Sequence, residues 1–398
     1  QTKQDAIEYL ASHIKINNKI ESEEKLMKKY KYVQDILDNE FLPHLGTNEK
    51  KKALYLGLMI EKLILTNNKI MKYDDRDSYV NKRIDTPGIL LANLYKMLFH
   101  KIIKDMKVNI NKEFNSGSWR ANKDFSKIIT KTNIYKIIKT SIIQTGLKYA
   151  LATGNWGTQK LSKKQGIAQV LSRLSYNSSI SHLRRINTPI EKTGKLIAPR
   201  KLHPTQIFLL CPAETPEGGS VGVVKNMALS VQITNKYSDE TVKLVLKDMN
   251  ITLTENINLL EYKKEYVKIF INGDWYGILS NPNNVLKKLK EKRNQGILNI
   301  YISISWDRMN NIININTDDG RIVRPLYKVT NNKLMINKKI INYLMDDKIK
   351  YNDLLMGNDK YNFKNVISLL DVEEINSNCL ISINEKKLKE HDNKHIHY

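Results

Sequence analysis

Residues 178–195 read SSISHLRRINTPIEKTGK, and this stretch decides how the rest of the chain is interpreted. Two adjacent arginines, Arg184 and Arg185, lead into Asn-Thr-Pro at 187–189, a combination that favours a turn. The residues after the turn are predicted to form an exposed basic tip at 192–195, which includes Lys192 and Lys195. The stretch therefore predicts a hairpin with cations at its base and at its tip.

The segments that follow add one arginine and two carboxylates. Residues 198–205 read APRKLHPT and contain Arg200, and residues 211–218 read CPAETPEG and contain Glu214 and Glu217. Such an arrangement can contact a nucleic-acid backbone with its tip while ion pairs fix the arginines from behind. A solvated hairpin held by local salt bridges is the alternative, and the residues by themselves leave it open.

Arginine is concentrated in this part of the chain. Residues 151–230 hold 11 Lys and Arg against three Asp and Glu, a local net charge of +8. Because the chain otherwise uses lysine, clustered arginine indicates that planar, bidentate donors are needed here. Four of the 11 arginines lie within 28 residues, namely Arg173, Arg184, Arg185 and Arg200.

The net charge of the whole chain is a weaker guide than its distribution. The 398 residues carry a formal net charge of +24, which invites a nucleic-acid interpretation because phosphate binding rewards Lys and Arg. However, the sequence is rich in Lys, Asn and Ile, which A/T-rich codons encode, so codon bias explains the charge equally well. The same bias suggests an A/T-rich genome, such as that of a large DNA virus.

Cysteine usage and hydropathy exclude several classes of protein. The two cysteines, Cys211 and Cys379, lie far apart and have no CxxC partner, which argues against a disulfide framework and suits a reducing compartment. The sequence contains no apolar run of about 18 residues, so it predicts no transmembrane helix. The N-terminal residues lack a signal-peptide core. They also lack an initiator Met, and we therefore expect the chain to be part of a longer protein.

Hydrophobic periodicity predicts an α+β fold that begins with helices. Residues 1–145 are predicted to be helical, with apolar residues at helical spacing in 7–14, 53–65, 89–99 and 128–138. The stretch at 53–65 is long enough to be a buried helix, and core packing is the expected role of all four.

The rest of the chain has a different pattern. Gly, Pro, Ser and Thr are frequent in 146–235, which predicts loops and short strands, whereas 236–330 is predicted to be rich in β-structure. Residues 267–279 predict a hairpin around Asn272-Gly273, and Ile300, Ile302 and Ile304 alternate as in a half-buried strand. The segment 331–398 is mixed and increasingly polar.

Two clusters could in principle bind a metal ion. Asp74, Asp75 and Asp77 could hold Mg²⁺, but a capped, salt-bridged loop is the favoured interpretation. Three terminal histidines have spacing suited to zinc, yet no further ligand is placed beside them; they are His391, His395 and His397. The sequence contains no phosphate-binding glycine loop and no supported hydrolytic triad, so it predicts no self-contained catalytic centre.

The motifs at 181–189 and 212–218 resemble the fork of the second-largest subunit of multisubunit DNA-dependent RNA polymerase. The eukaryotic, archaeal and large-DNA-virus branch fits better than the bacterial subunit, and residues 145–157 are also similar to that branch. Upstream, the motifs at 41–44, 74–77 and 82–83 resemble its lobe. Downstream, Asn272-Gly273 with Trp275, Asp318 with Gly320-Arg321, and Arg324-Pro325-Leu326 resemble its first external region.

This resemblance implies roles for particular residues. Residues 191–195 would be the fork loop that faces the separating DNA strands, although Glu191 and Lys192 stand where the family pattern has Gly-Arg. Residues 158–165 would be the other fork loop, near the RNA–DNA hybrid. The resemblance also implies that Arg184 and Arg185 support this fork loop. It implies that Arg200 and Glu217 lie nearest the active centre.

The resemblance also implies partners and a division of the chain. The partners would be the largest polymerase subunit, other subunits, the DNA template, the RNA–DNA hybrid and nucleoside triphosphates, with no membrane. Mg²⁺ would be held mainly by the largest subunit and none by this chain alone. The implied regions are a lobe at 1–145, a fork at 146–235, a first external region at 236–330 and a second, truncated external segment at 331–398.

Three functions remain open at this level. The first is a part of an assembled nucleotidyltransferase, located in the nucleus, a cytoplasmic viral factory or a virion. The lysines of that enzyme that bind the RNA–DNA hybrid, its wall, its clamp and its protrusion would lie outside this chain. The second is a stand-alone basic module that binds nucleic acid without catalysis. The third is a structural interaction protein whose charge reflects codon bias.

Overall fold

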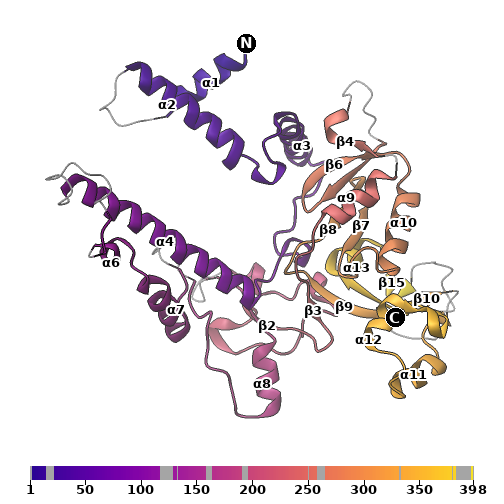
Figure 1. The fold of residues 1–398 in the computed structure, drawn as a ribbon. Helices are drawn as coiled ribbons and strands as arrows, with labels where there is room; N and C mark the ends of the chain where they lie inside the picture. The colour runs from indigo at the N-terminus through magenta and orange to yellow at the C-terminus, as the bar shows by residue number, and fades with distance from the viewer. Residues whose placement is uncertain are drawn as a thin grey trace. The chain divides into compact units, whose positions relative to one another are not determined.

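The computed structural model has the predicted α+β fold, and its described residues fall into two compact units (Figure 1). Unit 1 combines Gln1–Asn81 with Thr234–Tyr398, and unit 2 is Lys82–Ile233. The structure describes residues 2–14, 22–116, 129–131, 133–157, 164–190, 196–249, 251–257, 265–330, 333–378, 380–381 and 396–397. The four regions expected from the resemblance stay a prediction.

A five-stranded mixed sheet forms the centre of unit 1. Its strand order is β4-β6-β5-β8-β7. All neighbours are antiparallel except β5 and β8, which run parallel. The strands are β4 (Thr252–Leu253), β5 (Val267–Ile271), β6 (Asp274–Leu279), β7 (Ser303–Asp307) and β8 (Ile312–Asn316).

The predicted hairpin at 267–279 is confirmed as β5 and β6. Asn272 and Gly273 join the strands with φ values of 50° and 85°. Positive φ at both central residues is what a two-residue hairpin turn requires, and Asn and Gly tolerate it best. The predicted strand around Ile300, Ile302 and Ile304 begins later, because β7 starts at Ser303.

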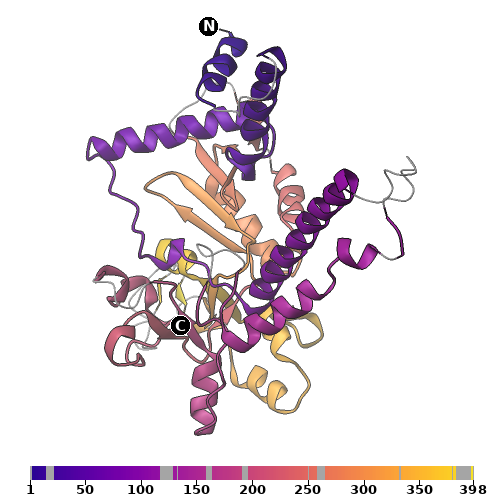
Figure 2. The ribbon, with the colours of Figure 1, turned by 90° about the vertical axis from the view of Figure 1, so that its left-hand side faces the viewer.

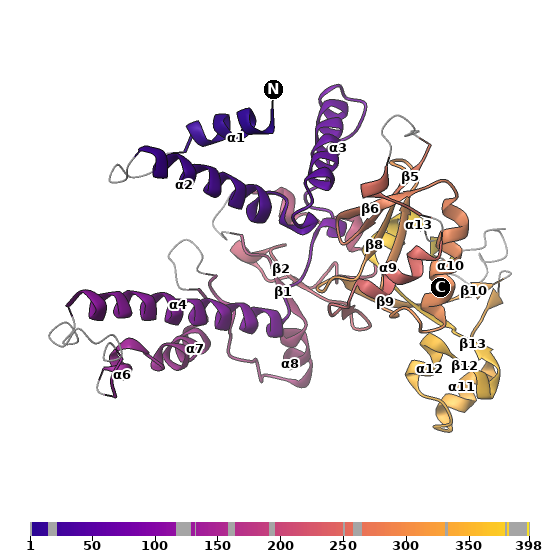
Figure 3. The ribbon, with the colours of Figure 1, turned by 45° about the horizontal axis from the view of Figure 1, so that its top comes forward.

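Helices cover both faces of this sheet. One face packs against α9 (Glu240–Lys247) and α10 (Pro282–Asn294) (Figure 3). In the hydrophobic core that they form, Leu246, Leu289 and Ile313 are fully buried. The other face presents Phe270 and Trp275 to α3 (Glu49–Asn67), whose Leu58 is buried against them. The sheet is therefore the middle layer of unit 1.

A second antiparallel pair extends unit 1. Strand β9 (Ile322–Tyr327) pairs with β14 (Ile367–Asp371), and the chain then enters α13 (Val372–Asn378), which lies against β7. Helices α11 (Lys338–Met345) and α12 (Tyr351–Met356) pack with β14 in a separate core. The short strands are β10 (Val329–Thr330), β11 (Lys333–Leu334), β12 (Gly357–Asn358), β13 (Phe363–Lys364), β15 (Leu380–Ile381) and β16 (Ile396–His397).

The N-terminal part of unit 1 is helical, as predicted, but it is not buried as predicted. Helices α1 (Lys3–Ser12) and α2 (Ser22–Asp35) precede a π-helical turn, η1 (Ile36–Glu40). In α3, Leu58 is the buried apolar side chain, whereas Leu63 is 69% exposed. The expectation of a buried helix at 53–65 is therefore wrong, because one side of α3 packs on the sheet while Met59 and Ile60 remain about half exposed.

Unit 2 begins with a long helix, α4 (Pro87–Ser116), and α7 (Ser141–Thr153) lies beside it (Figure 2). Leu94 and Leu98 of α4 pack with Ala150 and Trp156 in the core of this pair. Tyr95 and Phe99 stack on one another but remain about half exposed, so core packing accounts for only part of the apolar pattern at 89–99. Of the helix predicted at 128–138, the structure shows α6 (Ile134–Ile137), and Ile128 lies outside the described residues.

The remainder of unit 2 is built from short elements, as predicted for loops and strands. Helix α8 (Tyr176–Leu183) is followed by β1 (Arg185–Asn187), which pairs with β2 (Val224–Asn226). The other strand is β3 (Gln232–Ile233). The 3₁₀ turns of the two units are η2 (Pro43–Leu45), η3 (Tyr79–Asn81), η6 (Ala198–Arg200), η7 (Pro204–Gln206), η8 (Gly218–Ser220), η9 (Thr254–Asn256) and η10 (Asp359–Tyr361).

Candidate nucleic-acid interface

The candidate site is organised around α8, an eight-residue helix with a polar cap. Ser175 is its N-cap, and the Ser175 hydroxyl accepts a hydrogen bond from the Ser178 amide at 3.1 Å. This bond satisfies one of the amides that the first helical turn leaves free, and Ser is a favoured residue for the role. The start of α8 is therefore fixed by the local sequence.

Ser172 attaches the preceding segment to α8 through three further hydrogen bonds. The Ser172 amide donates to His182 Nδ1 at 3.0 Å, and the Ser172 carbonyl accepts from the Ser179 hydroxyl at 2.7 Å. The Ser172 and Ser178 hydroxyls lie 2.6 Å apart. Because the Ser172 amide can only donate, His182 Nδ1 is the accepting nitrogen. Nε2 of His182 therefore carries the proton and donates to Gln169 Oε1 at 3.0 Å.

Arg184 caps the other end of α8 and its side chain points into the unit. Nη2 of Arg184 donates to the carbonyls of Ala228 and Val231 at 2.6 and 2.8 Å. The Arg184 carbonyl accepts from the Met227 amide at 3.1 Å. Arg184 therefore connects α8 to the segment that follows β2, which is the geometry of a supporting residue.

Arg185 differs from its neighbour, because it is exposed. It begins β1 and lies opposite Asn226 in the antiparallel pair with β2. The β1–β2 pairing fixes its backbone, while its guanidinium makes no hydrogen bond or ion pair with any residue that the structure describes. The two adjacent arginines thus have different surroundings, although the sequence presents them as a pair.

A carboxylate lies beside the middle of α8. The Ser181 hydroxyl donates to Glu214 Oε1, and Asn226 Nδ2 donates to the Glu214 carbonyl at 3.1 Å. These bonds join α8, β2 and the CPAETPEG segment. The ion pairs that the sequence suggested between Glu214, Glu217 and the arginines are absent among the described residues, because Glu214 bonds the Ser181 hydroxyl and Glu217 is exposed.

Arg200 supports the loop that carries Glu217. Nη1 of Arg200 donates to the carbonyls of Gly219 and Val221 at 2.6 and 3.0 Å. Gly222 passes so close that a Cβ atom there would lie 2.1 Å from the Arg200 carbonyl oxygen. The two segments that the sequence showed as separate motifs are therefore in direct contact.

Three of the predicted site residues cannot be located in this way. Glu191, Lys192 and Lys195 lie outside the described residues, as do residues 158–163 of the other predicted fork loop. At the end of that loop, the backbone of Lys164 pairs with Trp156, and Lys164 Nζ lies 3.1 Å from Asp85. The chain on either side of both segments is described.

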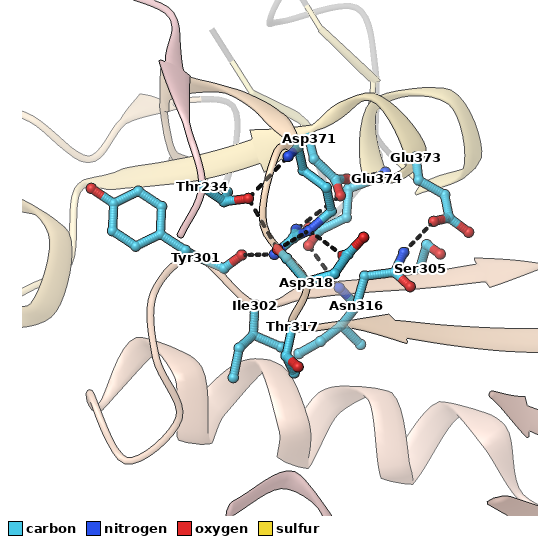
Figure 4. Close-up of polar contacts among 12 residues, drawn as sticks. Thr234, Tyr301, Ile302, Ser305, Asn316, Thr317, Asp318, Asp371, Glu373 and Glu374 are labelled. Carbon is cyan, nitrogen blue, oxygen red and sulfur yellow. Dashed lines mark hydrogen bonds and ion pairs between the residues drawn. The ribbon is translucent and has the colours of Figure 1, made fainter. Parts of the chain in front are cut away.

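A second polar cluster, in unit 1, was missed by sequence reasoning (Figure 4). Arg293 of α10 is buried and donates to both carboxylate oxygens of Glu374 and to the Ile302 carbonyl at 2.7 Å. Burial acts to raise the pKa of Glu374, but the charge and the hydrogen bonds of Arg293 outweigh the effect of burial. The pKa of Glu374 is therefore lowered overall. No local sequence signal could show this pair, because its members are 81 residues apart.

Arg321 forms the neighbouring part of the same cluster. Its guanidinium lies 3.1 Å from Asp371 and 2.9 Å from Asp318, and it also donates to the Tyr301 carbonyl at 2.7 Å. Figure 4 labels these three partners. The adjacent Glu373 accepts from the side-chain amides of Asn314 and Asn316 at 2.6 and 2.7 Å, and burial raises its pKa. The cluster joins α13 to the central sheet and has a structural role.

A cavity of about 450 Å³ lies beside α9 in unit 1. Burial raises the pKa of Asp274, which lines it, and the charges of Lys51 and Lys243 act in the opposite direction. The charged lining residues are three lysines and three carboxylates, so their charge selects neither an anion nor a cation; they are Lys51, Lys243, Lys247, Glu240, Glu255 and Asp274.

The two candidate metal clusters do not gain support. In the first, Asp75 Oδ1 accepts from the Asp77 amide at 2.9 Å, which is the geometry of a capped turn. Across the ranges that the structure describes, no three His, Cys, Asp or Glu side chains are grouped as metal ligands. The side chains of His391, His395 and His397 lie outside those ranges. No described helix is long and apolar enough to span a membrane.

Comparison with known proteins places these residues in a family. Models of three domains of the RNA polymerase subunit Rpb2 match the chain in order: domain 2 at residues 1–85, domain 3 at 169–233 and domain 4 at 269–330. The arginines and carboxylates around α8 all lie within the domain 3 match. The chain belongs to the family of second-largest subunits of multisubunit DNA-directed RNA polymerase.

Individual relatives agree with this assignment. The chain is 39% identical over 360 residues to the RNA polymerase II subunit RPB2 of Encephalitozoon cuniculi, covering 89% of this chain and 30% of the relative. It is 40% identical over 320 residues to RNA polymerase II subunit 2 of Arabidopsis thaliana, covering 79% and 26%. It is 30% identical over 384 residues to the archaeal subunit Rpo2 of Saccharolobus shibatae, covering 93% and 31%.

The chain therefore spans 26–31% of the length of these relatives. The resemblance to eukaryotic and archaeal subunits that the motifs indicated is confirmed.

Proposed function

We propose that this chain acts within an assembled DNA-directed RNA polymerase and shapes the downstream fork of the transcription bubble during RNA synthesis. The in-order match to three domains of the second-largest subunit carries this proposal. The geometry around α8 agrees with it, since the pairing of β1 with β2 fixes the backbone of the exposed Arg185. The same in-order match gives no support to a stand-alone binding module.

The residues take different parts in this function. Arg185 and the segment 191–195 face the nucleic acid, with Glu191, Lys192 and Lys195 at the tip. Arg184 supports them from within, as its two carbonyl contacts suggest. Arg200 and Glu217 lie nearest the active centre, where their effect on template and nucleotide is electrostatic and positional, with no covalent step.

The chemistry requires partners that this chain does not supply. The largest subunit and other polymerase subunits complete the enzyme, and the largest subunit holds most of the Mg²⁺ ligands. Mg²⁺ held by those ligands would supply neutralisation of the charge that develops as the nucleoside triphosphate reacts. The eukaryotic relatives favour a nuclear location, and a viral origin, with synthesis in a viral factory or virion, stays a prediction.

Reconstituted polymerase tests this proposal. A polymerase is assembled from its partner subunits and this chain, the chain carrying Arg185→Ala, and elongation is measured on a pre-formed bubble. Loss of a phosphate contact at the fork is expected to slow elongation and to make it more sensitive to salt. Arg76→Ala, which removes an exposed arginine of unit 1, is the control. Equal elongation by the Arg185→Ala and Arg76→Ala enzymes would contradict the proposed role.

A further inference from the structure

The described arginines of unit 2 fall into two groups. Arg184 and Arg200 each donate to two backbone carbonyls, and Arg83 donates to the Lys82 carbonyl at 3.1 Å. Arg173 and Arg185 are exposed and make no hydrogen bond or ion pair with any described residue. An exposed guanidinium with five free donors is suited to binding a phosphate.

Both free arginines are attached to α8, one at each end. Arg173 stands two residues before the N-cap Ser175, and Arg185 follows directly after Arg184, the C-cap. Ser172, the neighbour of Arg173, bonds to Ser179 and His182, so the chain before α8 runs alongside the helix. Helix α8 therefore connects the backbones of the two arginines, so that both can contact one strand.

The backbones of both arginines are fixed while their side chains remain free. Ser172, the neighbour of Arg173, makes three hydrogen bonds to α8 through Ser178, Ser179 and His182. Arg185 is held by its pairing with β2 and by the inward-pointing Arg184. Such preorganisation reduces the conformational entropy that is lost when a ligand binds.

An aromatic side chain lies between them in the sequence. Tyr176, the first residue of α8, is 79% exposed and follows Arg173 by three residues. Exposed aromatic rings beside cations are the usual means by which proteins stack on the bases of single-stranded nucleic acid.

We propose that Arg173 and Arg185 form one phosphate-binding pair for a single strand of nucleic acid, spaced by α8, with Tyr176 as a stacking surface. This inference rests on the proposed function and adds Arg173 and Tyr176 to it. Arg184 takes no direct part in binding, because both of its carbonyl contacts lie within unit 2.

The test uses the full 398-residue chain and a fluorescein-labelled single-stranded oligonucleotide. Binding is followed by fluorescence anisotropy over a range of salt concentrations. Each phosphate contact to a single strand contributes about 0.7 to the slope of log K against log salt. We expect Arg173→Ala and Arg185→Ala each to lower the slope by about 0.7, and the double variant by about 1.4.

Conservative and control variants separate this role from a structural one. Arg173→Lys retains the charge and is expected to keep the slope of the unchanged chain. Tyr176→Ala is expected to weaken binding by roughly 5-fold or more, whereas Tyr176→Phe is expected to retain the affinity of the unchanged chain. The salt slope is expected to stay unchanged in both variants. Arg76→Ala removes one exposed arginine of unit 1 and is expected to leave slope and affinity as they are.

The outcomes distinguish this inference from the function on which it rests. If the unchanged chain binds with a salt-dependent affinity and Arg173→Ala matches Arg76→Ala, the inference is overturned while the proposed function stands. If the unchanged chain shows no salt-dependent binding, the nucleic-acid role proposed for this segment is also overturned.

Discussion

Buried charges carry the sharpest consequences at the scale of single residues. Arg293 and Glu374 are both almost fully buried, and each is the counter-ion of the other. A buried pair of this kind contributes little net stability by itself, because both ions lose their hydration. Removing one member is different, because the remaining charge stays buried without a partner.

Glu374→Gln is therefore expected to destabilise unit 1 by about 3–5 kcal/mol, since it leaves Arg293 buried without a counter-ion. Urea unfolding followed by circular dichroism measures the change. The control is Glu255→Gln, because Glu255 is about half exposed and pairs with Lys51 at 3.4 Å. An exposed pair contributes at most about 1 kcal/mol, so equal effects of the two substitutions would contradict a buried ion pair at Arg293.

Lys328 gives unit 1 a pH-dependent stability. Burial lowers the pKa of Lys328 to about 7, and the positive charges of Arg293 and Lys290 add to the effect of burial. The unfolded chain keeps the ordinary lysine pKa, so between pH 7 and about 10 it binds more protons than the folded chain. The free energy of unfolding therefore rises with pH in this window, and the cost of the buried charge is fully present below pH 7.

The contribution of Lys328 is expected to reach about 1.4 kcal/mol per pH unit within that window. Urea unfolding at pH 6, 7, 8 and 9 measures it as the difference between the unchanged chain and Lys328→Met. The variant should be the more stable of the two at pH 6 and should lose that advantage as the pH rises. A difference that does not vary with pH would show that Lys328 keeps its ordinary pKa when folded.

At the scale of elements, close contacts between short segments hold unit 2 together around α8. The loop from Glu214 to Gly222 has little regular structure and is fixed by the side chains of Arg200, Ser181 and Asn226. Such a loop depends on how closely its backbone approaches its neighbour. Gly222 is the point of closest approach, with a φ of +68°.

Gly222→Ala is expected to displace this loop, because the added Cβ would collide with the Arg200 backbone. Gly166→Ala is a matched control, since Gly166 has the same φ of +68° and open space around it. The control should cost about 1–2 kcal/mol from backbone strain alone. Gly222→Ala should cost at least about 1 kcal/mol more, and limited proteolysis should then cut within 214–222. Equal unfolding free energies would rule out the close approach.

At the scale of the whole molecule, the described residues form two units that carry the predicted site in unit 2 and the buried ion-pair cluster in unit 1. Apolar side chains such as Leu63 of α3 are exposed, although soluble proteins keep apolar patches small unless a partner covers them. This agrees with the proposed function, in which the chain acts inside an assembled polymerase.

The purified chain alone is expected to make no RNA in a template-dependent extension assay with Mg²⁺ and all four nucleoside triphosphates. The reason is chemical, since phosphoryl transfer requires metal ligands that the proposal assigns mainly to the largest subunit. Product from the chain alone, resistant to removal of contaminating polymerase, would contradict the proposal. The assembled enzyme, assayed in parallel, is the positive control.

Sequence reasoning succeeded where the determining interactions are local. The turn at Asn272-Gly273 follows from the φ values that two neighbouring residues tolerate, and the helices follow from apolar spacing within a few turns. Family membership was also readable, because the motifs around Arg184, Arg185 and Glu217 are contiguous in the sequence. Burial was harder to predict, as Leu63 shows, because it depends on what else packs against a helix.

The sequence by itself thus determined the fold class, the local elements and the family. The tertiary structure alone decided which charged side chains are free and which are already bound. Arg184 and Arg185 are neighbours in the chain, yet one is held by carbonyls 44 and 47 residues away and the other is exposed. Arg293 and Glu374 meet across 81 residues for the same reason. Hydrogen bonds and burial are set by distance in space, which a pattern along the chain does not contain.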